Sequence, residues 1–290
     1  MSPWRVLVEN ELSTQGQMAR DAALAEEASP TVRFFTWTPP AVSLGWKQRA
    51  PEWLSCADGV EVVERPTGGG AAFHGSDVSV AVIVPRTLAL PLEVLMRAVC
   101  HSAARLCHWC GAEVTCVLEA HAEGRITYCL SQPSPYAVLS GSRKLAGFSL
   151  RRYSNSWLIQ GSLLVRPIPA QLVRNIPDAV GHQLRTRAIS LSEATHTVLD
   201  ERTVAVQWAQ HWSSWWHSDF TDFNPVIGPR LSAVGRMVQQ EHAGGRDVAP
   251  IGAGLRVPRA LPVGLHMMTP IPVMTDSCRG ESTPSSTISV

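Results

Sequence analysis

Three consecutive glycines, Gly68-Gly69-Gly70, lie between two runs of β-branched residues and restrict the possible folds of this chain more than any other feature. The runs extend from Val60 to Glu64 and from Val78 to Val84, and both are typical of strands. Glycine permits positive φ angles and close approach of the backbone to a ligand, so the loop is either a binding element or a plain hairpin turn. No Gly-Lys-Ser/Thr follows the glycines and a strand is expected after them, which excludes a phosphate-binding P-loop and a dinucleotide fingerprint.

The rest of the chain predicts a mixture of helices and short strands. Helices are expected over residues 17–27, which are rich in alanine, and from Leu92 to Cys110, with Gly111 as the C-terminal cap. Thr31 to Trp37 alternates β-branched and aromatic residues before a Pro-Pro turn, which indicates a strand. Five later segments are also predicted to be strands: 114–118, 126–130, 137–139, 145–150 and 157–165. This pattern predicts an α/β (α+β) protein.

The last predicted helix carries tryptophans at positions 208, 212, 215 and 216 and begins near Asp200 or Thr203. We expect these tryptophans to pack in the core rather than to bind an aromatic ligand. Beyond Phe223 the sequence becomes rich in Gly, Pro, Ser and Thr, which is typical of a disordered tail. We therefore expect one domain over residues 1–223 and a low-complexity tail over residues 224–290.

Composition excludes several classes of partner. The formal net charge of +1 gives no electrostatic reason to expect nucleic acid or an anionic membrane as a partner. No run approaches the ~20 apolar residues of a membrane span, and the first residues, followed by Glu9 and Glu11, do not form a signal peptide. The chain has seven cysteines, an odd number, and we expect them to be reduced thiols in a cytoplasmic protein.

A second candidate site element is Lys144, which follows a predicted turn at Ser140 to Arg143 and precedes Gly147. A partly buried lysine can orient a carbonyl or phosphate group and can favour a nearby thiolate, whereas an exposed turn lysine is the alternative. Cys107-His108-Trp109-Cys110 is a single CxxC at the end of the predicted helix. Because no second pair of ligands accompanies it, we interpret it as helix packing and expect no metal site.

Five segments resemble motifs of the biotin/lipoate protein ligase superfamily, in the order in which that superfamily has them. Arg65 to His74 is similar to the R(R/P)(S/T)GGGAVxH loop, and Lys144 to Arg152 resembles the K(I/V)AGSAQRR element. The other three are Gln17 to Asp21 (NMAxD), Pro39 to Trp46 (PxxSLG) and Gly161 to Leu164 (HGSLL). The resemblance implies the catalytic domain fold of that superfamily, a class II aminoacyl-tRNA synthetase-like mixed or antiparallel sheet flanked by helices.

Four positions depart from the superfamily pattern. Gly70 is more typical of ligases than of transferases, Gln17 replaces an asparagine, Gly75 replaces an aspartate, and Gln160 replaces a histidine.

Within the superfamily, Cys129 favours one activity. Cys129 to Tyr136 is similar to the CFxxPSxYEL segment of the cysteine-dependent octanoyltransferases, and His74 to Pro85 follows the transferase pattern rather than the ligase pattern HDxGNxNFS. The resemblance implies that Cys129, activated near Lys144, attacks the thioester of octanoyl-acyl carrier protein. A lysine of a lipoyl domain or of glycine-cleavage H protein then takes the acyl group. The alternative for Cys129 is a small buried apolar residue.

The predicted site thus has Cys129 and Lys144 as catalytic residues, with backbone amides stabilising the oxyanion. Binding of the acyl group or substrate is expected from seven other residues: Arg65, Thr67, Gly68, Gly69, Gly70, His74 and Gly147. A transferase of this kind uses no cofactor. The first alternative, a lipoate-protein ligase, would use ATP and Mg²⁺ and act through lipoyl-AMP. The second is a non-catalytic relative that binds lipoyl domains.

Overall fold

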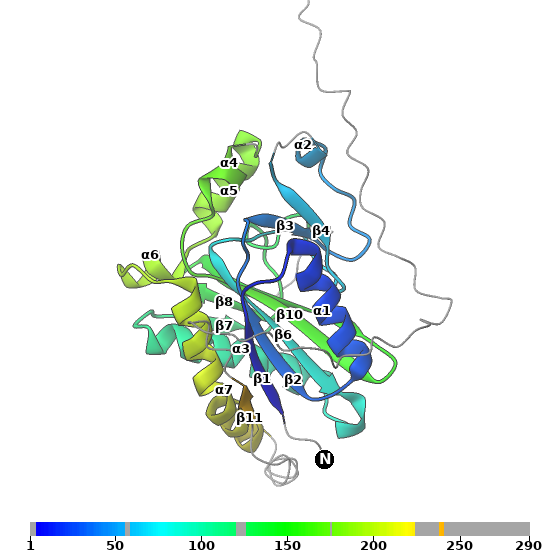
Figure 1. The fold of residues 1–290 in the computed structure, drawn as a ribbon. Coiled ribbons are helices and arrows are strands. Elements are labelled where there is room, and N and C mark those ends of the chain that lie inside the picture. The colour runs from blue at the N-terminus through cyan, green and yellow to red at the C-terminus, as the bar shows by residue number, and fades with distance from the viewer. Residues whose placement is uncertain (1–3, 56–58, 120–125, 175, 224–237, 241–290) are drawn as a thin grey trace, which may run out of the picture.

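The computed structural model describes residues 4–55, 59–119, 126–174, 176–223 and 238–240 of the chain (Figure 1). In this part a sheet of eight strands runs through the centre. Its strands lie in the order β11 (Val238–Gln240), β1 (Arg5–Glu9), β2 (Thr31–Phe35), β6 (Asp77–Pro85), β10 (Ser156–Leu164), β9 (Arg143–Arg152), β8 (Ala137–Ser140) and β7 (Thr115–Val117). β1 pairs in parallel with β2 and β11, and the other pairs are antiparallel, so the predicted mixed sheet is confirmed.

β6 is a central strand, and its sequence explains why. The nine residues Asp77–Pro85 are all buried, as expected for a run of β-branched residues that is covered on both faces. The four valines at 78, 80, 82 and 84 enter the main hydrophobic core, whereas Ala81 and Ile83 belong to a separate apolar cluster. Because side chains alternate along a strand, Asp77 and Ser79 lie on the same face as Ala81. β6 therefore carries apolar residues to one face and polar residues to part of the other.

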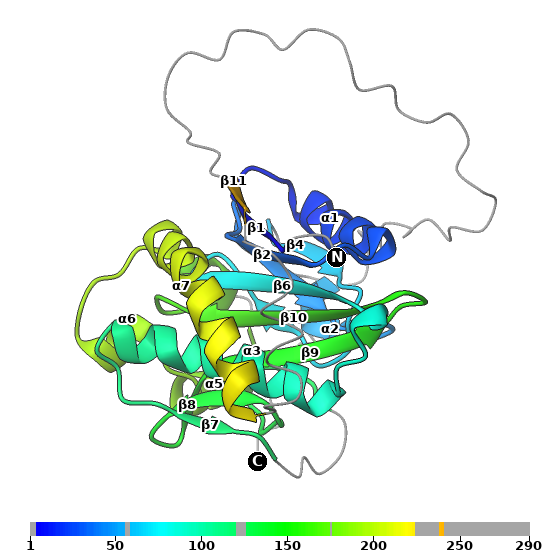
Figure 2. The ribbon, with the colours of Figure 1, turned by 90° about the horizontal axis from the view of Figure 1, so that it is seen from below.

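Two long helices cover the valine face, α3 (Leu92–Trp109) and α7 (Glu201–Phe223), as Figure 2 shows. Gly111 follows the C-terminal end of α3, and its φ of 92° and its backbone N–H bond to the carbonyl of His108 form the expected cap. Asp200 precedes α7, and its carboxylate accepts from the backbone N–H of Thr203 at 2.8 Å, as a capping residue does. Trp208 and Trp212 are fully buried against Phe34 of β2, which confirms the predicted packing for these two tryptophans.

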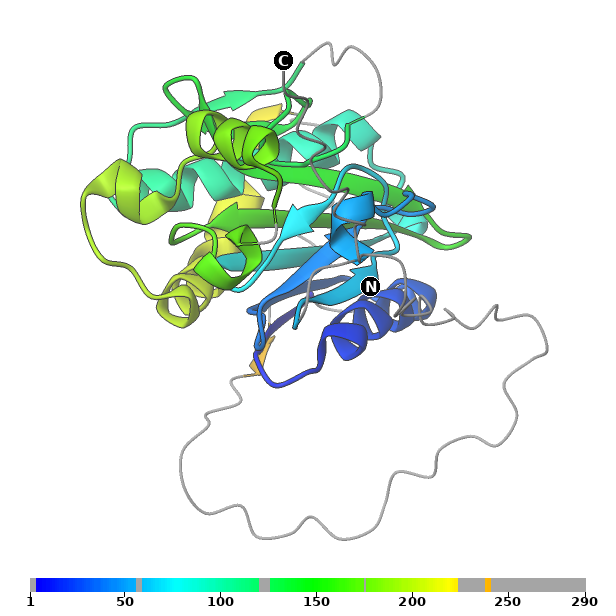
Figure 3. The ribbon, with the colours of Figure 1, turned by 90° about the horizontal axis from the view of Figure 1, so that it is seen from above.

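The opposite face carries α1 (Thr14–Glu27) and a small sheet, visible in Figure 3. The small sheet has the strand order β4 (Glu61–Glu64), β3 (Ala41–Leu44) and β5 (Ala72–Phe73). Shorter helices complete the described structure: α2 (Glu52–Ser55), η1 (Arg86–Leu88), α4 (Ala170–Val173), α5 (Asp178–Arg187) and α6 (Leu191–Thr195). The glycine loop connects β4 to β5, so it passes from one strand of the small sheet to another before the chain enters β6.

Most predicted elements are present, with shifts of a few residues at their ends. α1 begins at Thr14 rather than at residue 17, because the Ser13 side chain accepts from the backbone N–H of Gly16 and starts the helix earlier. Cys107 is buried in the main hydrophobic core, and Cys110 is partly buried and packs against that core, in agreement with the packing interpretation of the CxxC. In the described residues, no group of His, Cys, Asp or Glu side chains could hold a metal ion, and no helix is long and apolar enough to cross a membrane.

The prediction of a strand over residues 126–130 is wrong. This segment makes one isolated bridge, between Ala71 and Tyr128, and then turns. The side-chain oxygen of Gln132 accepts from the backbone N–H groups of Thr127 and Tyr128, at 2.5 and 3.0 Å, and so takes two donors that a neighbouring strand would otherwise bind. Of the predicted tail, residues 224–237 and 241–290 lie outside the described residues, and Val238–Gln240 forms β11 at the edge of the sheet.

Candidate active site

A pocket of about 600 Å³, including its open mouth, lies on the α1 side of the large sheet. Residues from α1, β2, β3, β6, β9, β10 and the glycine loop line it. Its apolar wall includes Met18, Phe35, Val80 and Phe148. A concave, mostly apolar site with a few polar groups is typical of a small-molecule site.

Cys129 lies in the turn that replaces the predicted strand, and two backbone hydrogen bonds tie this turn to the glycine loop. Ala71 N–H donates to the carbonyl of Thr127 at 2.7 Å, and Cys129 N–H donates to the carbonyl of Ala71 at 2.9 Å. The Cys129 side chain lines the pocket and is half-buried. Its position therefore depends on the path of the glycine loop.

Lys144 reaches the same pocket from β9. Its amine donates to the carbonyl of Cys129 at 2.8 Å, to Ser134 Oγ at 2.6 Å and to the carbonyl of Gln132 at 3.4 Å. The lysine is only 5% exposed, so the alternative of an exposed turn lysine is wrong.

A β-bulge directs Lys144 and Gly147 to the same side of the sheet. Leu139 pairs with Lys144 and Val138 pairs with Ala146, which leaves Leu145 as an extra residue in β9. In a regular strand, residues 144 and 147 would face opposite sides. Here an ideal Cβ on Gly147 would lie 3.1 Å from the Lys144 amine and 3.3 Å from the Cys129 sulfur. The thiol and the amine thus both lie next to the bare face of Gly147.

Arg65 is a buried cation beside the thiol. Its guanidinium donates to the carbonyls of Ser43, Gly68 and Gly70 and to the Ser43 hydroxyl, at 2.7 to 3.2 Å. No carboxylate pairs with it among the described residues. Burial lowers the pKa of Arg65, and the charge interaction with Cys129 opposes this shift. Arg65 therefore stabilises the conformation of the glycine loop through these hydrogen bonds, and its positive charge lies near the Cys129 sulfur.

His74 belongs to a chain of side chains that leads to Arg65. His74 Nδ1 lies 2.8 Å from Asp77 Oδ2, and Nε2 lies 2.8 Å from Ser43 Oγ. The imidazole stacks on Trp37, with ring centroids 4.1 Å apart. Burial raises the pKa of Asp77, but the charge of His74 and hydrogen bonds from His74, Ser162 and the backbone outweigh it and hold this pKa below its ordinary value. Asp77 is therefore an acceptor, and Nδ1 carries a proton.

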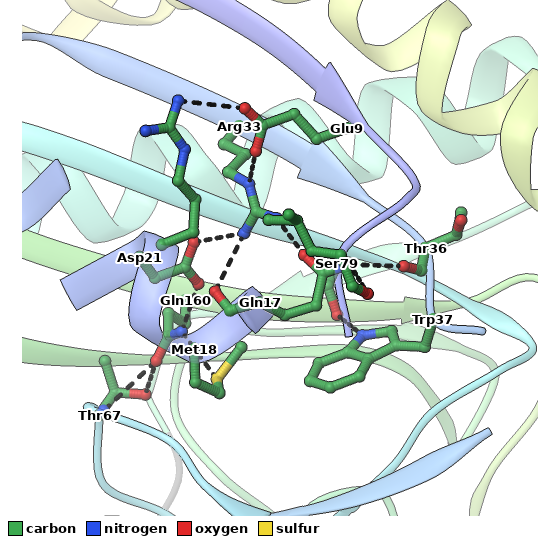
Figure 4. A network of polar contacts seen from close by, with 12 residues as sticks. Glu9, Gln17, Met18, Asp21, Arg33, Thr36, Trp37, Thr67, Ser79 and Gln160 are labelled. Atoms are coloured by element: carbon green, nitrogen blue, oxygen red, sulfur yellow. Dashed lines mark hydrogen bonds and ion pairs between the residues drawn. The ribbon is translucent and has the colours of Figure 1, made fainter. Parts of the chain in front are cut away.

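Behind the pocket, a second polar network joins α1 to the glycine loop (Figure 4). Arg33 is fully buried and pairs with Asp21 at 2.7 Å and with Glu9 at 2.5 Å. Gln160 donates to Asp21 at 2.6 Å, and its carbonyl accepts from the hydroxyl of Thr67 at 2.7 Å and from the backbone N–H of the same residue. An amide can donate at one end while it accepts at the other, so Gln160 meets both demands without ionising.

The structure brings most of the predicted site residues together in the pocket: Arg65, Gly69, Gly70, His74, Cys129, Lys144 and Gly147 line it. Thr67 and Gly68 do not line it. Thr67 is buried against Gln160, and Gly68 has no atom within 4 Å of where a Cβ would be. Three further lining or supporting residues were not predicted from the sequence: Ser43, Asp77 and Ser134. Each lies inside a segment that carried the resemblance or next to one, but its role depends on contacts with distant parts of the chain.

Comparisons with known proteins show the family of this chain. The model of the lipoyl protein ligase A/B catalytic domain matches residues 13–212. Octanoyltransferase LipM of Carboxydothermus hydrogenoformans is 30% identical, and the match covers 57% of this chain and 66% of that protein, so the chain spans about two thirds of that relative's length. Octanoyltransferase LipM of Symbiobacterium thermophilum is also 30% identical, with 66% of this chain and 78% of that protein covered.

Among solved structures, a bi-partite lipoate protein ligase of Thermoplasma acidophilum superposes with a TM-score of 0.54 and covers 80% of this chain and 92% of that one. At 16% identity this similarity shows the fold alone. The family model covers well over half of the chain, and it includes the glycine loop, Cys129 and the lysine strand. The chain therefore belongs to the lipoyl protein ligase A/B catalytic domain family.

Proposed function

We propose that this chain is an octanoyltransferase that moves an octanoyl group from acyl carrier protein to a protein lysine through a thioester on Cys129. The observation that supports this most is that the Cys129 thiol and the Lys144 amine both lie next to Gly147, at one side of a pocket with apolar walls. A thiolate is both a good nucleophile and a good leaving group, so it suits a transfer in two steps. The two curated relatives named as octanoyltransferases also support it.

In the first half-reaction, the thiolate of Cys129 attacks the carbonyl carbon of the donor thioester. The bond from sulfur to the acyl carbon forms, the bond to the carrier sulfur breaks, and the carrier leaves as a thiolate. Lys144, as an ammonium, gives this leaving thiolate a proton and becomes a neutral amine. The buried guanidinium of Arg65 favours the anionic states of this step, because few water molecules screen its charge.

In the second half-reaction, a lysine amine of the acceptor attacks the acyl-Cys129 carbon and the thiolate of Cys129 leaves. The incoming lysine is an ammonium in water and must lose one proton before it attacks. Lys144, now neutral, can take that proton. The second proton is lost from the new amide nitrogen and passes to the sulfur or to solvent.

The acyl chain is expected to lie against the apolar wall, where burial of each methylene contributes about 0.8 kcal/mol. We propose a lipoyl domain or glycine-cleavage H protein as the acceptor and the cytoplasm as the location. The T. acidophilum ligase, whose structure was described together with its E2 lipoyl domain as parts of a lipoylation system, supports an acceptor of this class. We further propose that the reaction needs neither ATP nor Mg²⁺, since the energy of the donor thioester is sufficient for amide formation.

The experiment that tests this function is an intact-mass measurement. Purified protein is mixed with octanoyl-acyl carrier protein, then with a lipoyl domain, in the absence of ATP. The wild type should gain the mass of one octanoyl group and pass it to the domain, and Cys129→Ser should gain none. A wild type that forms no adduct, and acylates the domain only with ATP and free lipoate, would establish the ligase alternative. Stable binding of the domain with neither activity would establish the non-catalytic alternative.

A further inference from the structure

The three hydrogen-bond partners of the Lys144 amine are not equivalent. Two are backbone carbonyls, those of Cys129 and Gln132, and a carbonyl can only accept. The third is the hydroxyl of Ser134, which lies 2.6 Å away and can either accept or donate. Ser134 is thus the one partner in this set that can change its role.

This set of partners satisfies the lysine in both protonation states. As an ammonium, Lys144 has three N–H groups for three acceptors. As a neutral amine, it has two N–H groups for the two carbonyls and one lone pair, which only the O–H of Ser134 can fill. Without the hydroxyl, the ammonium would keep one N–H group without an acceptor and the neutral amine would keep a lone pair without a donor, and a buried polar group left without a partner costs about 1 to 3 kcal/mol.

Ser134 also connects the buried amine to the open part of the site. Lys144 is 5% exposed, whereas Ser134 is half-buried and lines the main pocket. A second cavity, of about 410 Å³ including its open mouth, is lined by Ser134 and Lys144 as well. A proton from an incoming substrate can therefore reach the hydroxyl more readily than the amine.

The charged groups around Lys144 include no described carboxylate that could be its fixed partner. The titratable or charged groups that share a cavity with it are Arg65, His74 and Cys129 in the main pocket and Arg187 in the second cavity. None of the described residues that line either cavity is a carboxylate. Lys144 thus shares neither cavity with a described carboxylate, and Ser134 is the neighbour of its amine that can both donate and accept.

From these contacts we propose that Ser134 is the proton relay of Lys144, which in the second half-reaction returns to the buried amine the proton that it gave up in the first. The inference rests on the proposed function. After the first half-reaction Lys144 is neutral, and the Ser134 O–H donates to it. The acceptor ammonium then gives a proton to Ser134 Oγ while Ser134 gives its own proton to Lys144, so the hydroxyl is unchanged and the amine becomes an ammonium again. The free amine of the acceptor then attacks the thioester.

The test measures the two half-reactions separately in three variants. Ser134→Ala removes the relay, Ser134→Thr keeps a hydroxyl, and Ser131→Ala is the matched control. Ser131 lies in the same turn, is 4% exposed and has a hydroxyl without a hydrogen-bond partner among the described residues. Formation of the octanoyl adduct from the donor gives the first rate. Loss of the adduct from isolated acyl-enzyme, after addition of a lipoyl domain over a range of pH, gives the second.

Ser134→Ala should slow the second half-reaction about 100-fold at neutral pH, which is the lower end of what positioned proton transfer contributes. The first half-reaction should change by less than about threefold, because both protonation states of Lys144 lose the Ser134 partner and both keep the two carbonyls. The rise of the second rate with pH should move to higher pH in Ser134→Ala. Ser134→Thr should restore both the rate and the pH profile, and Ser131→Ala should behave as the wild type.

Two results would overturn the relay while leaving the proposed function intact. One is an equal loss in both half-reactions with an unchanged pH profile, which is what a merely structural hydroxyl would cause. The other is a Ser134→Ala acyl-enzyme that transfers at the wild-type rate. A wild type that forms no adduct would instead remove the proposed function itself. Thermal unfolding of each variant establishes that it is folded, and Ser134→Thr keeps the test valid if Ser134→Ala is not.

Discussion

Replacement of Gly70 by alanine should separate the glycine loop from the segment that carries Cys129. An ideal Cβ at this position would lie 2.7 Å from the carbonyl carbon and oxygen of Thr127 and 2.8 Å from the amide nitrogen of Tyr128. Carbon atoms in contact lie about 3.5 Å apart, so the two segments would have to move apart by close to 1 Å. All three clashing atoms belong to the backbone, so no side-chain rotation relieves the clash.

The movement would break the two backbone hydrogen bonds between Ala71 and the turn, of 2.7 and 2.9 Å. At about 1 kcal/mol each, their loss should destabilise the protein by about 2 kcal/mol and lower Tm by about 4 to 8 °C. A displacement of about 1 Å at a reacting group costs about 100-fold in rate, so acylation of Cys129 should slow by about that factor.

The assay for Gly70→Ala combines thermal unfolding with the rate of octanoyl adduct formation measured by mass. Gly68→Ala is the control, because its Cβ would meet no atom within 4 Å and it should behave as the wild type. If Gly70→Ala is acylated as fast as the wild type, then Cys129 does not depend on the glycine loop for its position and the reasoning fails.

Three further predictions follow from the same contacts. Gln160→Leu leaves the buried carboxylate of Asp21 without its amide donor, so urea denaturation should give a free energy of unfolding lower by about 1 to 3 kcal/mol. The pKa of Asp77 is depressed, so its carboxylate contributes stability that is present above the unfolded value of 3.8 and is lost as pH falls through the folded value. Asp77→Asn should therefore be less stable than the wild type at pH 7, and circular dichroism should show the difference shrinking below pH 3.8. Gly147→Ala places a methyl group between the thiol and the amine, and the rate of adduct formation should fall about 100-fold with little change in Tm.

Local sequence patterns predicted the elements in which apolar residues recur at the spacing of a strand or a helix. The valine run of β6 and the apolar spacing of α3 each define a face, and both elements appear within one or two residues of the expected ends. The motif resemblance also predicted that the glycine loop, Cys129 and Lys144 would belong to one site, because these segments occur in the superfamily order.

Contacts between distant residues could not be predicted in the same way. The segment 126–130 has the composition of a strand, but Gln132 takes two of its backbone donors and turns the chain. The direction of Lys144 depends on a bulge at Leu145, and a bulge is a mismatch between two strands rather than a property of one of them. The Ser190–Glu193 capping box is a missed signal, since Ser-x-x-Glu in the sequence indicates the start of α6.

The charges of the site explain why it suits anionic intermediates. Arg65 and Lys144 are both buried, and their hydrogen-bond acceptors in the described structure are carbonyls and hydroxyls. Each cation has lost most of its water without gaining a carboxylate, so each is stabilised when negative charge forms beside it. In the proposed reaction, the thiolate of Cys129, the oxyanion of each tetrahedral intermediate and the leaving carrier thiolate would all supply such charge. An acceptor ammonium does the opposite, because it would add a third cation to the pocket. The same charges that favour attack by sulfur therefore oppose entry of a protonated amine, and removal of that proton is the step for which the site most needs a relay.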